Sequence, residues 1–218
     1  MPYKKSEIAR QAILSAAAAL FRERGYENVN MLDISKSAGI SRASLYYYYD
    51  NKFSIADHLV DLFSQRIEKF LQLREEKKED PFVTVIVLAY ATLKIMIEND
   101  PALPFADIID YTRYGKEQLN YLGAHHSFPC SWQVFEKYGG KALTQKEKHT
   151  FILMSNAITR TLCRSITSGQ LDYSLEDALG YFFQMFYLRP LNLPEKLYRE
   201  KYREAVAVAE ENQELLRF

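Results

Sequence analysis

The sequence has few of the residues that mark disulfide-rich scaffolds or common catalytic motifs. Its 218 residues include two cysteines, one tryptophan and eight glycines. Because Cys130 and Cys163 cannot build a disulfide framework, we expect a reducing compartment and a cytoplasmic protein. There is no glycine-rich phosphate loop, no His-Glu-x-x-His, no Cys-x-x-Cys and no Gly-x-Ser-x-Gly. The chain therefore shows no motif of these enzyme classes, and we predict no catalytic residue and no cofactor.

Long hydrophobic runs are also lacking. The longest apolar stretch covers residues 82–97 and contains Lys94, whereas a membrane-spanning helix needs about 20 apolar residues. Near the N-terminus, Glu7 and Arg10 precede the apolar run 12–21. Apolar residues recur there at helical spacing, which indicates one face of a helix rather than a signal peptide. We therefore expect no membrane partner.

The chain carries no excess of charge of either sign, with 28 basic and 28 acidic residues. The distribution is uneven, however. Residues 1–52 hold eight Lys and Arg against five Asp and Glu, and the remainder holds 20 against 23. A basic segment of net charge +3 on a body of −3 is a weak indication of nucleic-acid contact near the N-terminus.

Helical periodicity runs through most of the chain, while the alternation typical of strands is scarce. Asp80-Pro81 and Asp100-Pro101 each resemble an N-cap followed by a first-turn proline. Thr144-x-x-Glu147 and Ser174-x-x-Asp177 are capping boxes. The predicted fold is all-α with nine to ten helices, which cover 3–24, two short segments within 30–48, 51–78, segments opening at 81 and 101, about 131–138, 144–168, 174–187 and a last one from 194.

The two short helices form a helix-turn-helix pattern. Asn30 is a good N-cap for the first helix, and Gly39 ends it. Ser41 caps the second helix, which contains the run Tyr46–Tyr49. Leu45 and Tyr49 share a face, so we expect Tyr49 to be buried and the other three tyrosines to point elsewhere. Periodicity alone leaves two readings open, which are a helix lying in a DNA major groove and a tyrosine-rich surface packed on another helix.

Residues 21–60, "FRERGYENVNMLDISKSAGISRASLYYYYDNKFSIADHLV", resemble the DNA-binding domain of the tetracycline-repressor (TetR) family of bacterial transcriptional regulators. The resemblance implies a DNA-binding domain at 1–52 and a ligand-sensing and dimerisation domain at 53–218. It also implies that Arg42, Ala43 and Tyr46 face base edges, whereas Ser44, Tyr47 and Tyr48 approach phosphates. Lys52 would bind a phosphate, and Asn30 and Ser41 complete the predicted DNA-binding set. Leu32 departs from the family, which often has a polar or basic residue there.

The C-terminal two-thirds would then dimerise and sense a ligand. The late helices fit an intersubunit bundle, with candidate interface residues Ile158, Leu162, Ile166, Phe182, Phe183 and Phe186. Apolar and aromatic side chains are the usual lining of a ligand pocket, and the candidates are Tyr90, Met96, Phe105, Tyr111, Tyr114, Trp132 and Phe135. For any one of these, ordinary core packing is the simpler alternative.

The resulting hypothesis is a homodimeric regulator that acts as a repressor, which a small lipophilic or aromatic inducer releases from palindromic double-stranded operator DNA. The inducer would shift the population of conformations so that the two recognition helices lose their register with the major grooves. The alternative is a TetR-like interaction protein that acts through protein–protein contacts. His125, His126 and Cys130 are weak evidence for a metal site, and we predict none.

Overall fold

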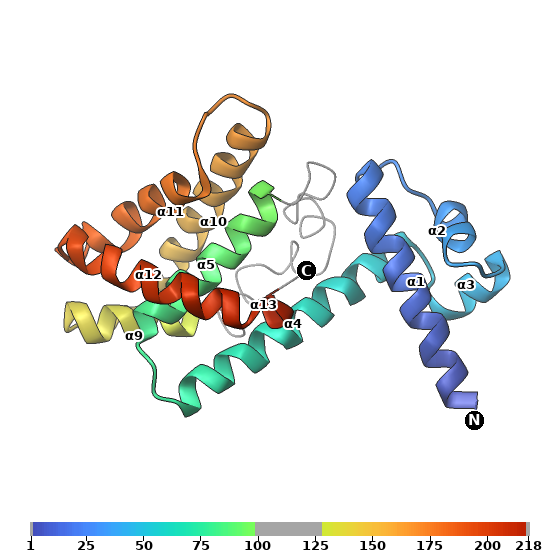
Figure 1. The fold of residues 1–218 in the computed structure, drawn as a ribbon, viewed down its shortest axis with the longest axis horizontal. Coiled ribbons are helices and arrows are strands. Elements are labelled where there is room, and N and C mark those ends of the chain that lie inside the picture. The colour runs from blue at the N-terminus through green and yellow to red at the C-terminus, as the bar shows by residue number, and fades with distance from the viewer. Residues whose placement is uncertain (1, 99–127, 217–218) are drawn as a thin grey trace. The chain divides into compact units, whose positions relative to one another are not determined.

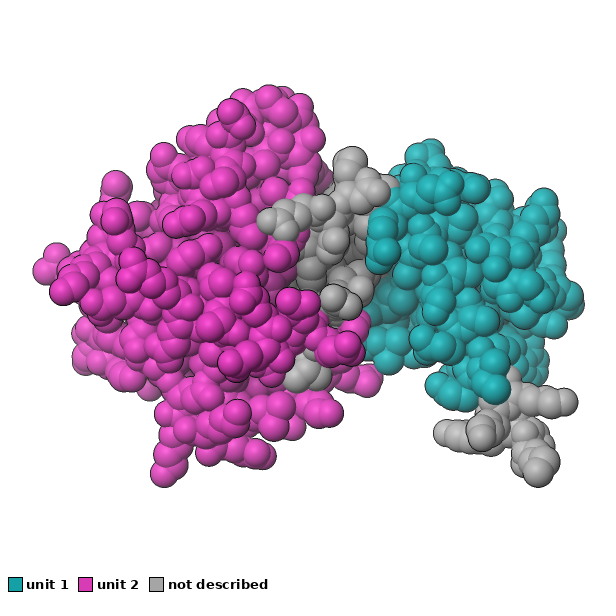
Figure 2. Space-filling model, in the orientation of Figure 1, with its two compact units in different colours: residues 1–62, 99–116 teal, residues 63–98, 117–218 magenta. Residues whose placement is uncertain are grey.

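The computed structural model describes residues 2–98 and 128–216, and every regular element in these ranges is a helix. The all-α prediction is confirmed. The described residues fall into two compact units, which are residues 2–62 and residues 63–98 with 128–216 (Figure 2). In the described part of the chain, no helix is both long enough and apolar enough to cross a membrane.

The first unit contains the helix-turn-helix predicted from the sequence (Figure 1). Its elements are α1 (Pro2–Arg24), α2 (Met31–Ser37), α3 (Arg42–Tyr48) and the first part of α4 (Lys52–Glu76). Each helix contributes a fully buried apolar side chain to one small core, namely Phe21, Ile34, Leu45 and Ile55. The burial of such side chains is worth about 1.5–3 kcal/mol each, so this core fixes the two short helices that could not be stable alone.

The second unit holds the remaining helices. They are α5 (Pro81–Glu98), α9 (Phe128–Gly139), α10 (Gln145–Thr167), α11 (Leu175–Phe183), the π-helical turn η1 (Gln184–Leu188), α12 (Glu195–Glu211) and α13 (Gln213–Leu216). The predicted start of α5 after Asp80 is confirmed, as are the capping boxes of Thr144 and Ser174. The π-helical turn and the earlier start of α9 were not predicted.

Helix α5 lies at the centre of the second unit and packs against α9, α10, α11 and α12 (Figure 1). Seven consecutive residues, 82–88, are buried. At its N-terminal end, the Phe82 ring lies 5.6 Å from the Tyr138 ring and 5.8 Å from the rings of Phe183 and Tyr187, measured between centroids. A helix that is hydrophobic on all sides must be covered on all sides, which explains why four helices surround it.

Asp80 fixes the N-terminus of α5 to two of these neighbours. One carboxylate oxygen accepts the Phe82 N–H at 3.0 Å. The other accepts the Tyr138 hydroxyl of α9 at 2.6 Å and forms an ion pair with Lys201 of α12 at 3.1 Å. These hydrogen bonds and the Lys201 charge outweigh the effect of burial, so the pKa of Asp80 is lowered. One half-buried carboxylate thus joins three helices.

We predict that Asp80→Asn lowers the free energy of unfolding by about 1–3 kcal/mol at neutral pH. The neutral amide can still cap α5, but it loses the ion pair with Lys201 and the charge-assisted hydrogen bond from Tyr138. Urea denaturation of the full chain measures this change. The matched control is Asp172→Asn, which makes the same substitution at an exposed residue and should change the unfolding free energy by less than about 0.5 kcal/mol. Equal effects of the two substitutions would contradict the role given to Asp80.

The same carboxylate predicts a pH dependence. Because the pKa of Asp80 is lower in the folded protein, its contribution to stability is complete above its unfolded pKa of about 3.9. That contribution is lost as the pH falls through the lower folded value. The stability difference between the parent and Asp80→Asn should therefore shrink below pH ~4, which urea denaturation at several acidic pH values tests.

Candidate nucleic-acid interface

Helix α2 is held at its start by a complete capping box. The Asn30 side-chain oxygen accepts the N–H groups of Leu32 and Asp33 at 2.9 and 3.0 Å, and the Asp33 carboxylate accepts the Asn30 N–H at 3.1 Å. Ile34 is fully buried beneath the helix. The side chain of Asn30, which the sequence placed in the DNA-binding set, is therefore already used to order α2.

The turn between α2 and α3 depends on a backbone conformation that glycine adopts readily. Gly39 has a φ of +66°, in the left-handed region that L-residues with a Cβ rarely occupy. The chain then reaches Ser41, whose hydroxyl accepts the Ser44 N–H at 3.0 Å and caps α3. The predicted turn and cap are confirmed. Ser41 Oγ also lies 2.9 Å from Ser44 Oγ, so the two hydroxyls form one polar pair at the start of α3.

Two buried side chains anchor α3. Leu45 is fully buried, and Tyr49, which follows the last turn, is 8% exposed. The Tyr49 hydroxyl lies 2.6 Å from His58 Nδ1 on α4. Burial raises the pKa of Tyr49 to about 12, so the phenol remains neutral and can donate or accept this bond. The prediction that Tyr49 is the inward-facing tyrosine is confirmed.

The rest of α3 faces solvent. Arg42, Ala43 and Ser44 are exposed, Tyr46 is 41% exposed and Tyr47 is 83% exposed. The Arg42 guanidinium lies over the Tyr46 ring at 5.5 Å from its centroid. Within one short helix, the surface therefore offers a guanidinium, a serine hydroxyl and two phenols, which can all hydrogen-bond to phosphates or base edges.

Tyr48 is oriented differently from its neighbours. It is half-buried, its ring meets the Tyr47 ring edge-on at 5.2 Å, and the Arg10 guanidinium of α1 lies 5.8 Å from its centroid. The sequence did not indicate a role for Arg10 at this surface. The spacing of residues within α1 could not reveal the contact, because Tyr48 lies on another helix. Arg10 adds a positive charge beside the exposed face of α3.

Lys52, predicted to contact a phosphate, is engaged within the protein. Its ammonium donates to the Tyr26 carbonyl oxygen at 2.6 Å and to the Glu27 carbonyl oxygen at 3.4 Å. It also lies 4.1 Å from the centroid of the Tyr26 ring. Burial lowers the pKa of Lys52. This ammonium thus ties the first turn of α4 to the segment that follows α1.

Comparison with known proteins identifies this unit. Residues 13–59 match the family model described as bacterial regulatory proteins of the tetR family. The chain is 31% identical over 100 residues to an uncharacterised helix-turn-helix transcriptional regulator of Mycobacterium tuberculosis, which covers 46% of this chain and 49% of that protein. The DNA-binding domain predicted from the resemblance is confirmed, because residues 13–59 match the tetR-family model.

A second relative matches the same domain. It is IcaR of Staphylococcus epidermidis, described as a negative transcriptional regulator of a biofilm operon. It is 50% identical over 46 residues, which is 21% of this chain and 25% of IcaR. The chain thus spans about half or less of the length of the curated relatives that it matches.

Solved structures extend the similarity of fold beyond this domain. NalD of Pseudomonas aeruginosa, described as a repressor of a multidrug efflux pump, has a TM-score of 0.56 at 17% identity and covers 84% of this chain and 96% of NalD. A gamma-butyrolactone receptor has a TM-score of 0.56 at 16% identity over 95% of this chain and 99% of that protein. At this level of identity, the likeness concerns the fold.

The candidate ligand residues do not gather around one cavity in the described chain. Met96 is buried with its Sδ 3.9 Å from Cys163 Sγ, and Tyr90 receives a hydrogen bond from Lys94 at 3.2 Å. Trp132 and Phe135 are buried on α9, and both rings meet Phe151 edge-on. Phe105, Tyr111 and Tyr114 lie outside the described residues, as do His125 and His126. Within the described ranges, no three His, Cys, Asp or Glu residues gather in a way that could hold a metal ion.

A cavity of about 110 Å³ does lie in the second unit, next to α5. Phe151 lines this cavity, and Trp132 and Phe135 pack against the Phe151 ring without lining the cavity themselves. Its lining is mostly apolar with several small polar groups, and consists of Val85, Leu88, Ala89, Thr92, Leu93, Ser131, Phe151, Ser155, Asn156, Thr159, Phe182 and Tyr187. Ser155 and Thr159 are four residues apart in the predicted helix 144–168 and therefore lie on one face of it. This spacing could have indicated from the sequence that the helix brings polar groups to the cavity.

The candidate dimer residues fall into two groups. Phe183 and Phe186 are 0% and 6% exposed, so their side chains belong to the core of the unit. Ile158, Leu162, Ile166 and Phe182 are half-buried. The large apolar side chains that α10, α11 and η1 do expose are Leu153, Met154, Tyr181 and Met185, with exposed fractions of 51–57%.

We predict that Lys52→Met lowers the unfolding free energy by about 1–2 kcal/mol, because two carbonyl groups lose their ammonium donor. The control is Lys36→Met, at an exposed residue of α2, which should leave stability within about 0.5 kcal/mol of the parent. Urea denaturation followed by circular dichroism measures both. An unchanged midpoint for Lys52→Met would show that Lys52 has no structural role in the folded protein.

Proposed function

We propose that this protein is a ligand-responsive, DNA-binding transcriptional regulator that acts as a repressor. The observation that carries the proposal is the tetR-family domain whose second short helix, α3, turns Arg42, Tyr46 and Tyr47 to solvent while Leu45 and Tyr49 hold it in place. A helix anchored on one face with a polar, aromatic outer face suits the major groove of B-DNA.

In this proposal, residues 1–52 form the DNA-binding domain, and Arg42, Ala43 and Tyr46 read base edges. Arg42 would pair with guanine, since a guanidinium matches its two major-groove acceptors. Ser44, Tyr47 and Tyr48 would contact phosphates and set the register. Asn30 and Ser41 would act mainly through the helices that they cap, with their N-terminal N–H groups turned towards phosphates.

Lys52 would serve two purposes. Its ammonium has three hydrogens, and two carbonyl oxygens of the protein lie within hydrogen-bonding distance. The remaining hydrogen could meet a phosphate, so a loss of DNA binding in a Lys52 variant must be separated from a loss of folding. For this reason, Lys52 is a poor first variant for testing DNA binding.

Residues 53–218 would sense a ligand and form the dimer, and a two-fold dimer would present two copies of α3 to a palindromic site. Two proteins to which this chain is similar support the repressor reading, since IcaR is described as a negative regulator and NalD as a repressor. Since Phe183 and Phe186 are buried, we propose that the exposed apolar residues of α10, α11 and η1 form the dimer surface.

The cavity beside α5 would hold the inducer. Its volume of about 110 Å³ lies below the ~300 Å³ of ordinary ligand pockets, so it favours a small and largely apolar molecule. The inducer would act by binding one conformation of the second unit more tightly than another. A coupling free energy of ~1–3 kcal/mol would weaken operator binding roughly 5- to 150-fold.

The direct test is selection of binding sites from a random duplex pool at about 0.1 M salt, within the range where phosphate contacts dominate affinity. We expect enrichment of one palindrome. The selected duplex is then used to measure the salt dependence of binding. If the folded protein enriched no sequence, and its duplex binding showed no steep salt dependence, the alternative reading as a protein-binding relative would replace the proposal.

We predict that Tyr46→Ala weakens binding to the selected palindrome by about 5- to 100-fold, because a base contact is worth about 1–3 kcal/mol. Binding to an unrelated duplex should change by less than about twofold. Tyr46→Phe separates the hydroxyl from the ring, and unfolding curves confirm that each variant is folded. Fluorescence anisotropy with both duplexes measures the result. An equal loss on both duplexes would assign Tyr46 to phosphate contact instead.

We predict that Met154→Glu on α10 shifts the protein from dimer to monomer, since an apolar interface does not accept an unpaired buried charge. The control is Ile8→Glu, which places the same charge on an exposed apolar residue of the first unit. Sedimentation velocity at micromolar protein measures both. A dimer that persists in Met154→Glu with unchanged affinity would exclude this residue from the interface.

A further inference from the structure

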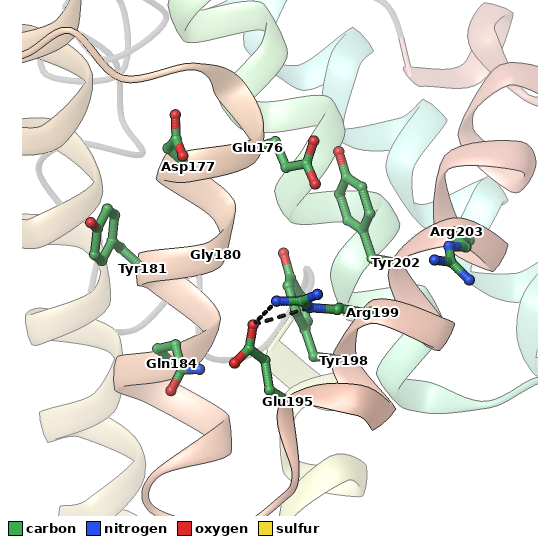
Figure 3. Close-up of a pocket in the computed structure, with 10 residues that line it drawn as sticks. All are labelled: Glu176, Asp177, Gly180, Tyr181, Gln184, Glu195, Tyr198, Arg199, Tyr202 and Arg203. Carbon is green, nitrogen blue, oxygen red and sulfur yellow. Dashed lines mark hydrogen bonds and ion pairs between the residues drawn. The ribbon is translucent and has the colours of Figure 1, made fainter.

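A polar groove lies on the surface of the second unit between α11 and α12 (Figure 3). Its volume is about 540 Å³, within the range of small-molecule sites. The cavity proposed for the inducer shares no lining residue with it. The groove is lined by Glu176, Asp177, Gly180 and Tyr181 of α11, by Gln184 at the start of η1, and by Glu195, Tyr198, Arg199, Tyr202 and Arg203 of α12.

At the base of the groove, Tyr198 carries an unsatisfied hydroxyl. The residue is 8% exposed, and its ring stacks on Phe183 with centroids 5.2 Å apart. Its hydroxyl oxygen is buried without a hydrogen-bond partner. Burial raises the pKa of this phenol, with smaller contributions from Tyr202 and Glu176, so it remains neutral. A buried polar group without a partner is costly, which is expected where a ligand supplies the missing partner.

Some of the charged groups that line the groove have hydrogen-bond partners within the described chain, and Glu176 does not. Glu195 accepts two hydrogen bonds from Arg199, at 3.0 and 2.6 Å. The carboxylate of Asp177 accepts the Ser174 hydroxyl and N–H in a capping box. Glu176, by contrast, makes no hydrogen bond or ion pair within the described chain, although it contributes to the pKa shifts of Tyr198 and Arg199.

The orientation of the side chains gives the groove a negative centre. Figure 3 shows the oxygen atoms of Glu176, Tyr198 and Tyr202 on the same side of α12, whereas the Arg203 guanidinium lies beyond Tyr202 and points away from Glu176. The Arg199 charge is balanced by Glu195. A carboxylate together with tyrosine oxygens and rings attracts an organic cation through hydrogen bonds, charge and cation–π contact.

Gly180 leaves space in the wall of the groove. It lies within α11, where glycine destabilises a helix relative to alanine. A Cβ built on it would meet no atom within 4 Å, so packing inside the protein does not require glycine here. The empty space beside the α11 backbone could instead receive the body of a ligand.

We propose that the groove between α11 and α12 binds a small aromatic amine. Its ammonium group donates hydrogen bonds to the Glu176 carboxylate and the Tyr198 hydroxyl, and its ring lies against Gly180. The Tyr198 hydroxyl is buried, so binding requires a neighbouring side chain to move aside. This site is additional to the proposed inducer cavity and does not depend on DNA binding.

Isothermal titration calorimetry of the full chain with 2-phenylethylamine tests the site. The neutral probe 2-phenylethanol and the anionic probe 3-phenylpropanoate share the phenyl group but not the positive charge. We expect the amine to bind in the millimolar range or tighter, and at least about tenfold more tightly than either comparison probe, as for a charge-assisted contact. No heat of binding from the amine at millimolar concentrations would overturn the proposal, as would equal affinities for the three probes.

Four substitutions test whether the amine binds in this groove. Glu176→Gln should weaken amine binding at least about tenfold and leave the alcohol unchanged. The matched control Glu200→Gln removes a carboxylate from α12 that pairs with Lys196 outside the groove, and it should have no effect. Gly180→Ala should weaken the amine by filling its space while raising the thermal midpoint. Equal losses in Glu176→Gln and Glu200→Gln would place the amine elsewhere.

Tyr198→Phe separates a ligand role from a structural role. Because the hydroxyl makes no hydrogen bond in the unliganded protein, its removal should leave the thermal midpoint equal to or above that of the parent. The same change should weaken the amine by about three- to tenfold, because its nitrogen loses an acceptor. A lower midpoint with unchanged amine affinity would show that Tyr198 serves only the fold.

Discussion

The burial of α5 is the constraint on which the second unit depends. Residues 82–88 are all buried, so this helix needs cover on every side. Asp80 orients that cover at one end, since its carboxylate bonds α5 to Tyr138 of α9 and Lys201 of α12. Burial of these apolar side chains favours folding, and the carboxylate fixes which neighbours meet at the helix start.

In the first unit, a similar division of roles produces the exposed face of α3. Leu45 within the seven-residue helix and Tyr49 directly after it are the two residues that point inward. Tyr46 and Tyr47 are then left outside, because a helix this short has only one face to bury. The four consecutive tyrosines thus have different environments. Tyr49 anchors the helix, Tyr48 lies beside Arg10, and Tyr46 and Tyr47 face solvent.

The sequence predicted best the features that depend on local chemistry. Caps at Thr144 and Ser174 and the inward turn of Tyr49 follow from spacing along one helix. It predicted least well the features that depend on contacts between distant segments. Lys52 bonds to carbonyl groups 25 and 26 residues earlier, and Phe183 is covered by α5 and α12. No periodicity within one helix carries such information.

Helix α4 gives the clearest route by which a change in the second unit could reach the exposed face of α3. It is one continuous helix whose residues 52–62 belong to the first unit and 63–76 to the second. Its first residue, Lys52, holds the segment after α1, and His58 holds Tyr49 at the end of α3. A rotation of α4 would therefore disturb both the contact that holds the end of α3 and the contact that holds the segment after α1. A ligand need not touch α3, because stabilising another orientation of α4 would be enough.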